Sequence, residues 1–118
     1  MSSKNPAQRL RDIAENIEAI RDFTSGMDVG IFVSSRRTIY AVTRALEIIS
    51  EASRRLPDDF KARYPSLDWV AIASAGNVYR HEYETVDEAQ VWYTAKHSLD
   101  ALDSAVRAEL ERLGELGT

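Results

Sequence analysis

The 118-residue chain contains no cysteine, which excludes a disulfide framework, a thiolate zinc site and a cysteine nucleophile. It has two histidines, too few to favour a catalytic metal site built from protein ligands alone. No apolar run approaches the roughly 18–20 residues that a transmembrane helix needs. The polar segment 1–10 lacks the apolar core of a secretory signal. These absences predict a cytoplasmic protein with no membrane association, no metal and no other cofactor.

What remains is the composition of a globular protein, with 44% hydrophobic and 29% charged residues. The length suits a single domain, and we take residues 1–118 as one unit. The net charge of −4 is unevenly distributed, because residues 35–65 carry +3 and residues 66–118 carry −6. An acidic total argues against tight non-specific binding to nucleic acid, which depends on neutralising phosphates.

A local basic surface is still compatible with this charge. Arg36, Arg37 and Arg44 lie in the basic middle segment, and Arg54 and Arg55 come after them. These arginines either form a track that binds RNA or simply carry the solvated face of their helix. The sequence favours neither interpretation.

Apolar residues recur at helical spacing along most of the chain. The pattern predicts a first helix ending at Phe23 or Thr24, a loose stretch from Gly26 to Ser34, and a second helix that Pro57 ends. Asp28, Ser34 or Ser35 can cap this second helix. The apolar stripes of the two helices are Leu10, Ile13, Ile17, Ile20 and Ile39, Val42, Leu46, Ile49, Leu56.

Three more helices are expected in the second half of the chain. Asp58-Asp59 is predicted to cap a short helix over 60–64, and Ser66 or Asp68 to open a fourth principal segment through Trp69 and Val78. Asp87 is predicted to cap one long final helix with a heptad-like stripe. The stripe consists of Val91, Ala95, Leu99, Leu102, Val106, Leu110 and Leu113. The sequence therefore predicts an all-α protein, an antiparallel four-helix up-and-down bundle with one extra short helix. Its surplus apolar surface predicts a symmetric homodimer.

The segment 74–83 carries the side chains best suited to chemistry. On a helix, Ser74, Asn77 and His81 share one face, and Arg80 lies beside them. A histidine titrates near neutral pH and can move a proton to or from a ribose hydroxyl, while an arginine can stabilise a phosphate. The alternative is a polar helix end near a dimer interface, in which His81 makes one structural hydrogen bond. Such triplets are common in helices, so spacing alone favours the structural alternative.

An ordered set of words along the chain resembles a known family. Residues 41–52, which contain Leu46-Glu47-Ile48-Ile49, resemble a helix with the pattern RNLEIIGEA. Asp68-Trp69, Asn77 and the segment 81–83 resemble the block W…RNxxxHxY, with Trp92 further along the chain. By these words the chain is similar to the HepT-like family of the HEPN superfamily, whose namesake is the toxin of the MNT–HepT toxin–antitoxin systems.

This resemblance implies a HEPN-type bundle and a metal-independent endoribonuclease that cleaves cellular RNA, such as tRNA or mRNA. It implies a composite site in which the motifs of two protomers face each other. It also implies inhibition by a cognate nucleotidyltransferase antitoxin (MNT) that adds AMP to the motif tyrosine, here Tyr83. His81 would be the general acid or base, Arg80 would stabilise the phosphorane, and Asn77 would orient the substrate.

One position departs from the family motif of Arg, four residues, His, one residue, Tyr. The motif arginine falls on Gly76, whereas His81 and Tyr83 match. Arg80 lies four residues after Gly76, on the same helical side, and can supply the charge from a shifted position. Alternatively the chain has lost cleavage and acts as a bundle that binds a nucleotidyltransferase partner.

Three aromatic side chains near this segment have plainer interpretations. Trp69 and Trp92 are expected to pack the segment against the final helix rather than to stack bases. His97 is expected to be a surface or boundary histidine rather than a ligand.

Overall fold

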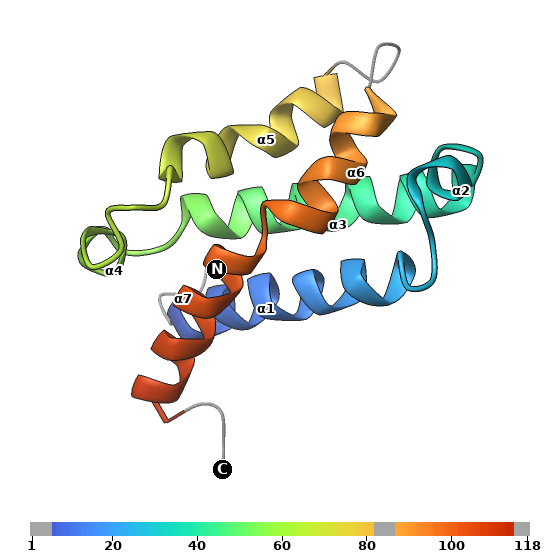
Figure 1. Ribbon diagram of the computed structural model, residues 1–118. Coiled ribbons are helices and arrows are strands. Elements are labelled where there is room, and N and C mark those ends of the chain that lie inside the picture. Colours follow the sequence, from blue (N-terminus) through green and yellow to red (C-terminus); the bar gives the residue numbers. More distant parts are fainter. Residues whose placement is uncertain (1–5, 82–86, 115–118) are drawn as a thin grey trace.

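A computed structural model describes residues 6–81 and 87–114 of the chain, and for residues 76–81 it describes the backbone alone. Every regular element in these ranges is a helix, which confirms the predicted all-helical bundle (Figure 1). The helices are α1 (Pro6–Phe23), α2 (Val29–Val33), α3 (Arg36–Arg54), α4 (Asp58–Ala62), α5 (Trp69–His81), α6 (Glu88–His97) and α7 (Asp100–Arg112). None of the helices in the described ranges is both long enough and apolar enough to cross a bilayer.

The centre of the molecule is α3, which packs against α1 on one side and α5 on the other. Each neighbour runs antiparallel to it (Figure 1). The predicted stripes of α1 and α3 are both buried, which confirms them. At the end of α1 it is Thr24, rather than Phe23, that joins the core, because Thr24 is buried and its hydroxyl donates to the Ile20 carbonyl, 2.8 Å away. Phe23 is exposed.

The predicted caps are largely confirmed. The side chain of Ser35 accepts from the Thr38 amide at the start of α3, and Asp87 accepts from the first amides of α6. Asp68, rather than Ser66, accepts from the Ala71 amide at the start of α5. At α4 the prediction was wrong in position, since Pro57 is the N-cap residue and the two aspartates lie within the first turn. There they remain favourable, because the N-terminal end of a helix attracts negative charge.

The stretch from Gly26 to Ser34 is more ordered than predicted. Gly26 has a φ of +76°, which ends α1 as expected, but α2 then forms where only a loose connection was expected. Two contacts explain the helix. Asp28 caps it by accepting from the Ile31 amide, and Phe32 is fully buried against Trp92, with ring centroids 5.2 Å apart.

The prediction of one long final helix was wrong. The chain leaves α6 at Ser98 and begins α7 after Leu99, so the two helices are separate (Figure 1). The apolar stripe stays buried across the break from Val91 to Leu110, while Leu113 at its end is exposed. Asp100 lies in the first turn of α7, where α1 holds it through Arg21 at 2.8 Å. Leu99 is buried at the break, and the carboxylate of Asp100 suits the N-terminal end of a new helix.

Two ion-pair groups fasten α7 to the rest of the bundle. Asp103 is buried and receives Arg21 at 2.9 Å and Arg107 at 3.0 Å. Further along, the side chain of Glu109 is 6% exposed and accepts from Arg63 and Arg112, each at 2.6 Å. The hydrogen bonds from Arg112 and Arg63 lower the pKa of Glu109, although burial acts in the opposite direction. A buried carboxylate with two guanidinium partners is costly to disrupt.

Replacing Glu109 with glutamine should therefore lower the free energy of unfolding by about 1–3 kcal/mol at pH 7. The folded-state pKa of Glu109 lies below the unfolded value of about 4.3. Its contribution is thus complete above the unfolded pKa and disappears as the pH falls through the folded pKa. Urea unfolding at pH 7 and near pH 3 measures this, with the exposed Glu111→Gln as control. A wild-type advantage over Glu109→Gln that does not change with pH would contradict the ion-pair explanation.

Candidate functional site

The N-terminal half of α5 is held by three anchors. The Trp69 indole donates to the carbonyls of Lys61 and Tyr64, at 3.2 and 3.1 Å. The Ser50 hydroxyl of α3 donates to the Ile72 carbonyl at 2.8 Å, and the Arg54 guanidinium donates to the Ala73 carbonyl. These bonds from α3 and α4 fix the start of α5 and therefore the direction in which its C-terminal half extends.

The predicted catalytic residues lie in that C-terminal half. Asn77, Arg80 and His81 are within α5, which remains helical through His81. The helical spacing on which their common face depends is thereby confirmed at the level of the backbone. Their side chains, and Tyr83 as a whole, lie outside the described residues. Ser74, the first member of the predicted face, is exposed, and its hydroxyl donates to the Val70 carbonyl at 2.9 Å.

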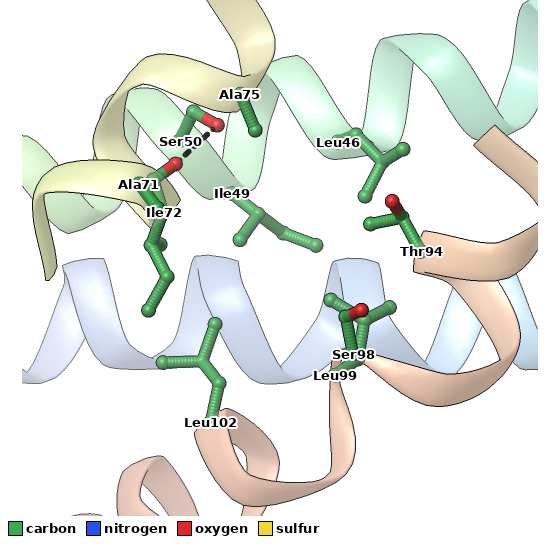
Figure 2. Close-up of a pocket in the computed structure, with 10 residues that line it drawn as sticks. All are labelled: Leu46, Ile49, Ser50, Ala71, Ile72, Ala75, Thr94, Ser98, Leu99 and Leu102. Atoms are coloured by element: carbon green, nitrogen blue, oxygen red, sulfur yellow. Dashed lines mark hydrogen bonds between the residues drawn. The ribbon is translucent and has the colours of Figure 1, made fainter. Parts of the chain in front are cut away.

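A cavity of about 210 Å³ lies between α5 and the junction of α6 with α7 (Figure 2). Its lining is Leu46, Ile49, Ser50, Ala71, Ile72, Ala75, Thr94, Ser98, Leu99 and Leu102. In Figure 2 the apolar side chains turn toward one another, and the Ser50 hydroxyl is occupied by the Ile72 carbonyl. No titratable side chain lines it among the described residues.

The opposite flank of α5 is an open, shallow depression. It is lined by Trp69, Val70, Ala73 and Ser74 of α5 together with Arg54 and Lys61. Val70 is 80% exposed, although it lies on a helix whose neighbouring residues are mostly apolar. The depression thus combines an exposed apolar side chain with two cationic ones.

The three candidate RNA-binding arginines are all exposed on the N-terminal half of α3. Arg36 does not point freely into solvent. Its guanidinium lies 5.6 Å from the ring centroid of Tyr40 and donates to the phenol oxygen at 3.3 Å. The hydrogen bond with Tyr40 raises the pKa of Arg36, which keeps the charge. Arg44 is paired with Glu47 at 3.3 Å.

Arg54 and Arg55 are separated from this set by their partners. Both form ion pairs with Glu51, at 3.0 and 2.9 Å, and Arg54 also holds α5. They therefore serve the packing of α3 and do not continue a free basic track. Tyr40 was missed by the sequence analysis. The signal that would have found it is the four-residue spacing between Arg36 and Tyr40, which puts an arginine over an aromatic ring on a helix.

Both tryptophans pack as predicted, but not against the predicted neighbours. Trp69 lies edge-on to Phe60, with ring centroids 5.5 Å apart, so it packs α5 onto α4. Trp92 packs α6 onto α2 through Phe32, and the Lys96 ammonium lies 5.3 Å from its ring centroid. His97 is exposed, as predicted, and its ring lies 4.8 Å from that of Tyr93.

The chain is similar to a family of known proteins. The family model described as "Ribonuclease HepT-like" matches residues 13–109. The chain is 41% identical over 93 residues to a probable ribonuclease HepT of Thermococcus cleftensis, covering 79% of this chain and 84% of that protein. It is also 32% identical over 106 residues to a putative RNase of Methanocaldococcus jannaschii, covering 90% and 97% of the two chains.

A putative RNase of Caldanaerobacter subterraneus is 28% identical over 109 residues, covering 92% of this chain and 97% of that protein. No solved structure matches the chain. The match of the family model spans every helix from α2 to α6 and most of α1 and α7. On this extent of similarity, the chain belongs to the ribonuclease HepT-like family.

Proposed function

We propose that this protein is a metal-independent endoribonuclease that acts as the toxin of a toxin–antitoxin pair. The observation that carries the proposal is the continuous helix of α5 in a chain of the ribonuclease HepT-like family. Because α5 is helical through His81, the spacing of Asn77 and His81 puts them on the face that begins with the exposed Val70 and Ser74. Gly76 and Arg80 are likewise one turn apart.

The proposed reaction is an internal transesterification. The ribose 2′-oxygen attacks the adjacent phosphorus and the bond to the 5′-oxygen breaks, which leaves a 2′,3′-cyclic phosphate and a 5′-hydroxyl. His81 moves the proton, since an imidazole exchanges protons near neutral pH. Arg80 stabilises the charge that develops on the phosphorane, and Asn77 orients the phosphodiester. Chemistry of this kind needs no metal.

The purified protein should cleave single-stranded RNA in the presence of EDTA. Replacing His81 with alanine should slow cleavage by about 100-fold or more, because general acid–base catalysis contributes about 10²–10⁴-fold. Replacing Arg80 with alanine should slow it by about 10²–10³-fold if this arginine stabilises the transition state. A substrate with a 2′-deoxyribose at the cut site should resist. Cleavage products separated on denaturing gels give the rates.

His97→Ala is the matched control, because His97 is exposed on α6 and stacks only against Tyr93 among the described residues. It should cleave like the wild type. Cleavage that stops in EDTA would refute the metal-independent mechanism. If His81→Ala and the wild type are equally inert, the chain is instead the binding bundle considered as the alternative. Full activity in Arg80→Ala alone would show that Arg80 does not replace the motif arginine at Gly76.

We further propose that two copies pair through α5, so that their two motifs face each other. The depression around Val70 supports this, since it is lined by apolar side chains together with Arg54 and Lys61, and Val70 is exposed in the single chain. The α5 helix packs chiefly against α3, which leaves its outer face for a second copy. A symmetric pair places the same patch opposite itself.

Val70→Lys should separate the pair, because it adds a cation to a patch that already holds Arg54 and Lys61 and faces its own copy. Sedimentation velocity at micromolar concentration should show a dimer for the wild type and a monomer for this variant. Cleavage should be lost with the dimer. Val29→Lys is the control, since Val29 is an exposed valine of α2 at a distance from α5 in the fold. A dimer that survives Val70→Lys would place the interface elsewhere.

Tyr83 is proposed as the residue that the antitoxin modifies. Its position two residues after His81 would bring the added AMP beside the groups proposed to hold the RNA phosphate. Expressing the chain alone should arrest growth, and a cognate nucleotidyltransferase should relieve the arrest. Peptide mass spectrometry should locate AMP on Tyr83. In Tyr83→Phe the arrest should persist despite the antitoxin, whereas the exposed Tyr93→Phe should be relieved normally. AMP on another residue, or relief of Tyr83→Phe, would refute the acceptor role.

A further inference from the structure

The N-terminal half of α3 carries an exposed aromatic side chain that the bundle does not use for packing. Tyr40 is 63% exposed, yet its orientation is held by Arg36, which lies over the ring and donates to the phenol oxygen. Buried aromatic side chains elsewhere, such as Phe32 and Phe60, pack against other rings. A ring that is exposed and held in place presents a flat surface to solvent, and a nucleobase can stack on such a surface.

The charges around Tyr40 distinguish it from the other basic surface of the protein. Many other guanidinium groups are held by carboxylates: those of Arg21, Arg44, Arg54, Arg55, Arg63, Arg107 and Arg112. Arg36 and Arg37 form no ion pair with a carboxylate in the part of the chain that the structure describes. No acidic residue occurs in the first turn of α3 either. These two cations are therefore available to a phosphate without first losing a carboxylate partner.

The position of Tyr40 along the bundle also matters. Ser50 of α3 contacts Ile72 of α5, and the two helices run antiparallel. Nine residues onward along α5 lead to His81, and nine residues back along α3 lead to Ala41, an axial distance of about 14 Å in each case. Tyr40 and the end of α5 consequently lie at about the same level of the bundle. A strand that stacks on Tyr40 is at the correct end of the molecule to reach His81.

We propose that the pair Arg36–Tyr40, together with Arg37, is a subsite that binds single-stranded RNA. A base stacks on Tyr40, and the guanidinium groups contact the flanking phosphates. An unpaired strand fits because its bases are free to stack, whereas those of a duplex are already stacked and paired. An exposed aromatic ring next to two arginines without carboxylate partners favours RNA over a protein partner, because it offers a base a stacking surface and the flanking phosphates two cations. The inference rests on the proposed ribonuclease function and names the form of its substrate.

Binding is best measured in the His81→Ala background, so that cleavage does not interfere. Fluorescence anisotropy with a short uridine-rich oligoribonucleotide should show about 10-fold or greater weakening for Tyr40→Ala, the typical effect of losing one stacked base. Tyr40→Phe keeps the ring and should bind nearly as the parent does. Arg37→Ala should weaken binding and should also reduce the slope of log affinity against log salt by about 0.7, the value for one phosphate contact on a single strand.

Tyr93→Ala is the matched control, because Tyr93 is also an exposed tyrosine but stacks on His97 instead of an arginine. It should bind like the parent, and a duplex of the same sequence should bind more weakly than the single strand. Unchanged affinity in both Tyr40→Ala and Arg37→Ala would overturn the subsite. If these two variants keep their RNA affinity but lose binding of the nucleotidyltransferase partner, the surface belongs to that protein and the subsite is likewise overturned.

The test separates this inference from the nuclease proposal. In the otherwise unmodified protein, Tyr40→Ala should raise KM for the oligoribonucleotide and leave kcat within about 2-fold, because losing uniform binding affects KM alone. An inert wild type whose RNA affinity still falls in Tyr40→Ala would refute the nuclease and support the subsite. If the wild type is active and Tyr40→Ala changes neither the RNA affinity nor KM, the result would support the nuclease and refute the subsite.

Discussion

Burial of α3 between α1 and α5 is the constraint on which the remaining structure depends. This helix presents apolar or small side chains to both neighbours, among them Val42, Ala45 and Ile49, and leaves one narrow exposed strip. The strip is the place where charge can be carried without a desolvation cost. Its C-terminal part is used for ion pairs with Glu51, and its N-terminal part carries Arg36, Arg37 and Tyr40. The same helix thus provides both the centre of the core and the basic surface.

The packing of α3 also determines the position of α5. Its first half is anchored through Trp69, Ser50 and Arg54, whereas the residues assigned to chemistry come in its second half. Anchoring one half of a rigid helix determines where the other half extends, because a helix transmits position along its axis. The cavity beside the first half of α5 is lined by apolar and small polar side chains and has no titratable lining among the described residues.

Arginine has two separate uses in this protein, and their distinction is physical. Arg63 and Arg112 hold the buried Glu109, and Arg21 and Arg107 hold the buried Asp103, so these cations stabilise the fold. Removing both arginines of either group would leave a buried carboxylate without compensation. Arg36 faces an aromatic ring instead, and a cation over a ring is still accessible to an anion. A count of basic residues could not separate the two groups.

Local features could be predicted from the sequence because each depends on residues within a few positions of one another. The stripes of α1 and α3, the caps at Ser35, Asp68 and Asp87, and the helical spacing through His81 are of this kind. Tertiary contacts decided the rest. Phe32 of α2 packs against Trp92 of α6, a contact between distant segments, and the break between α6 and α7 coincides with the tie from Arg21 to Asp100. Some arginines pair with a carboxylate three or four residues away, as Arg55 does with Glu51, and such pairs can be read from helical spacing. Others pair with carboxylates that folding brings near from distant segments, as Glu109 is brought to Arg63, and no local pattern contains that information.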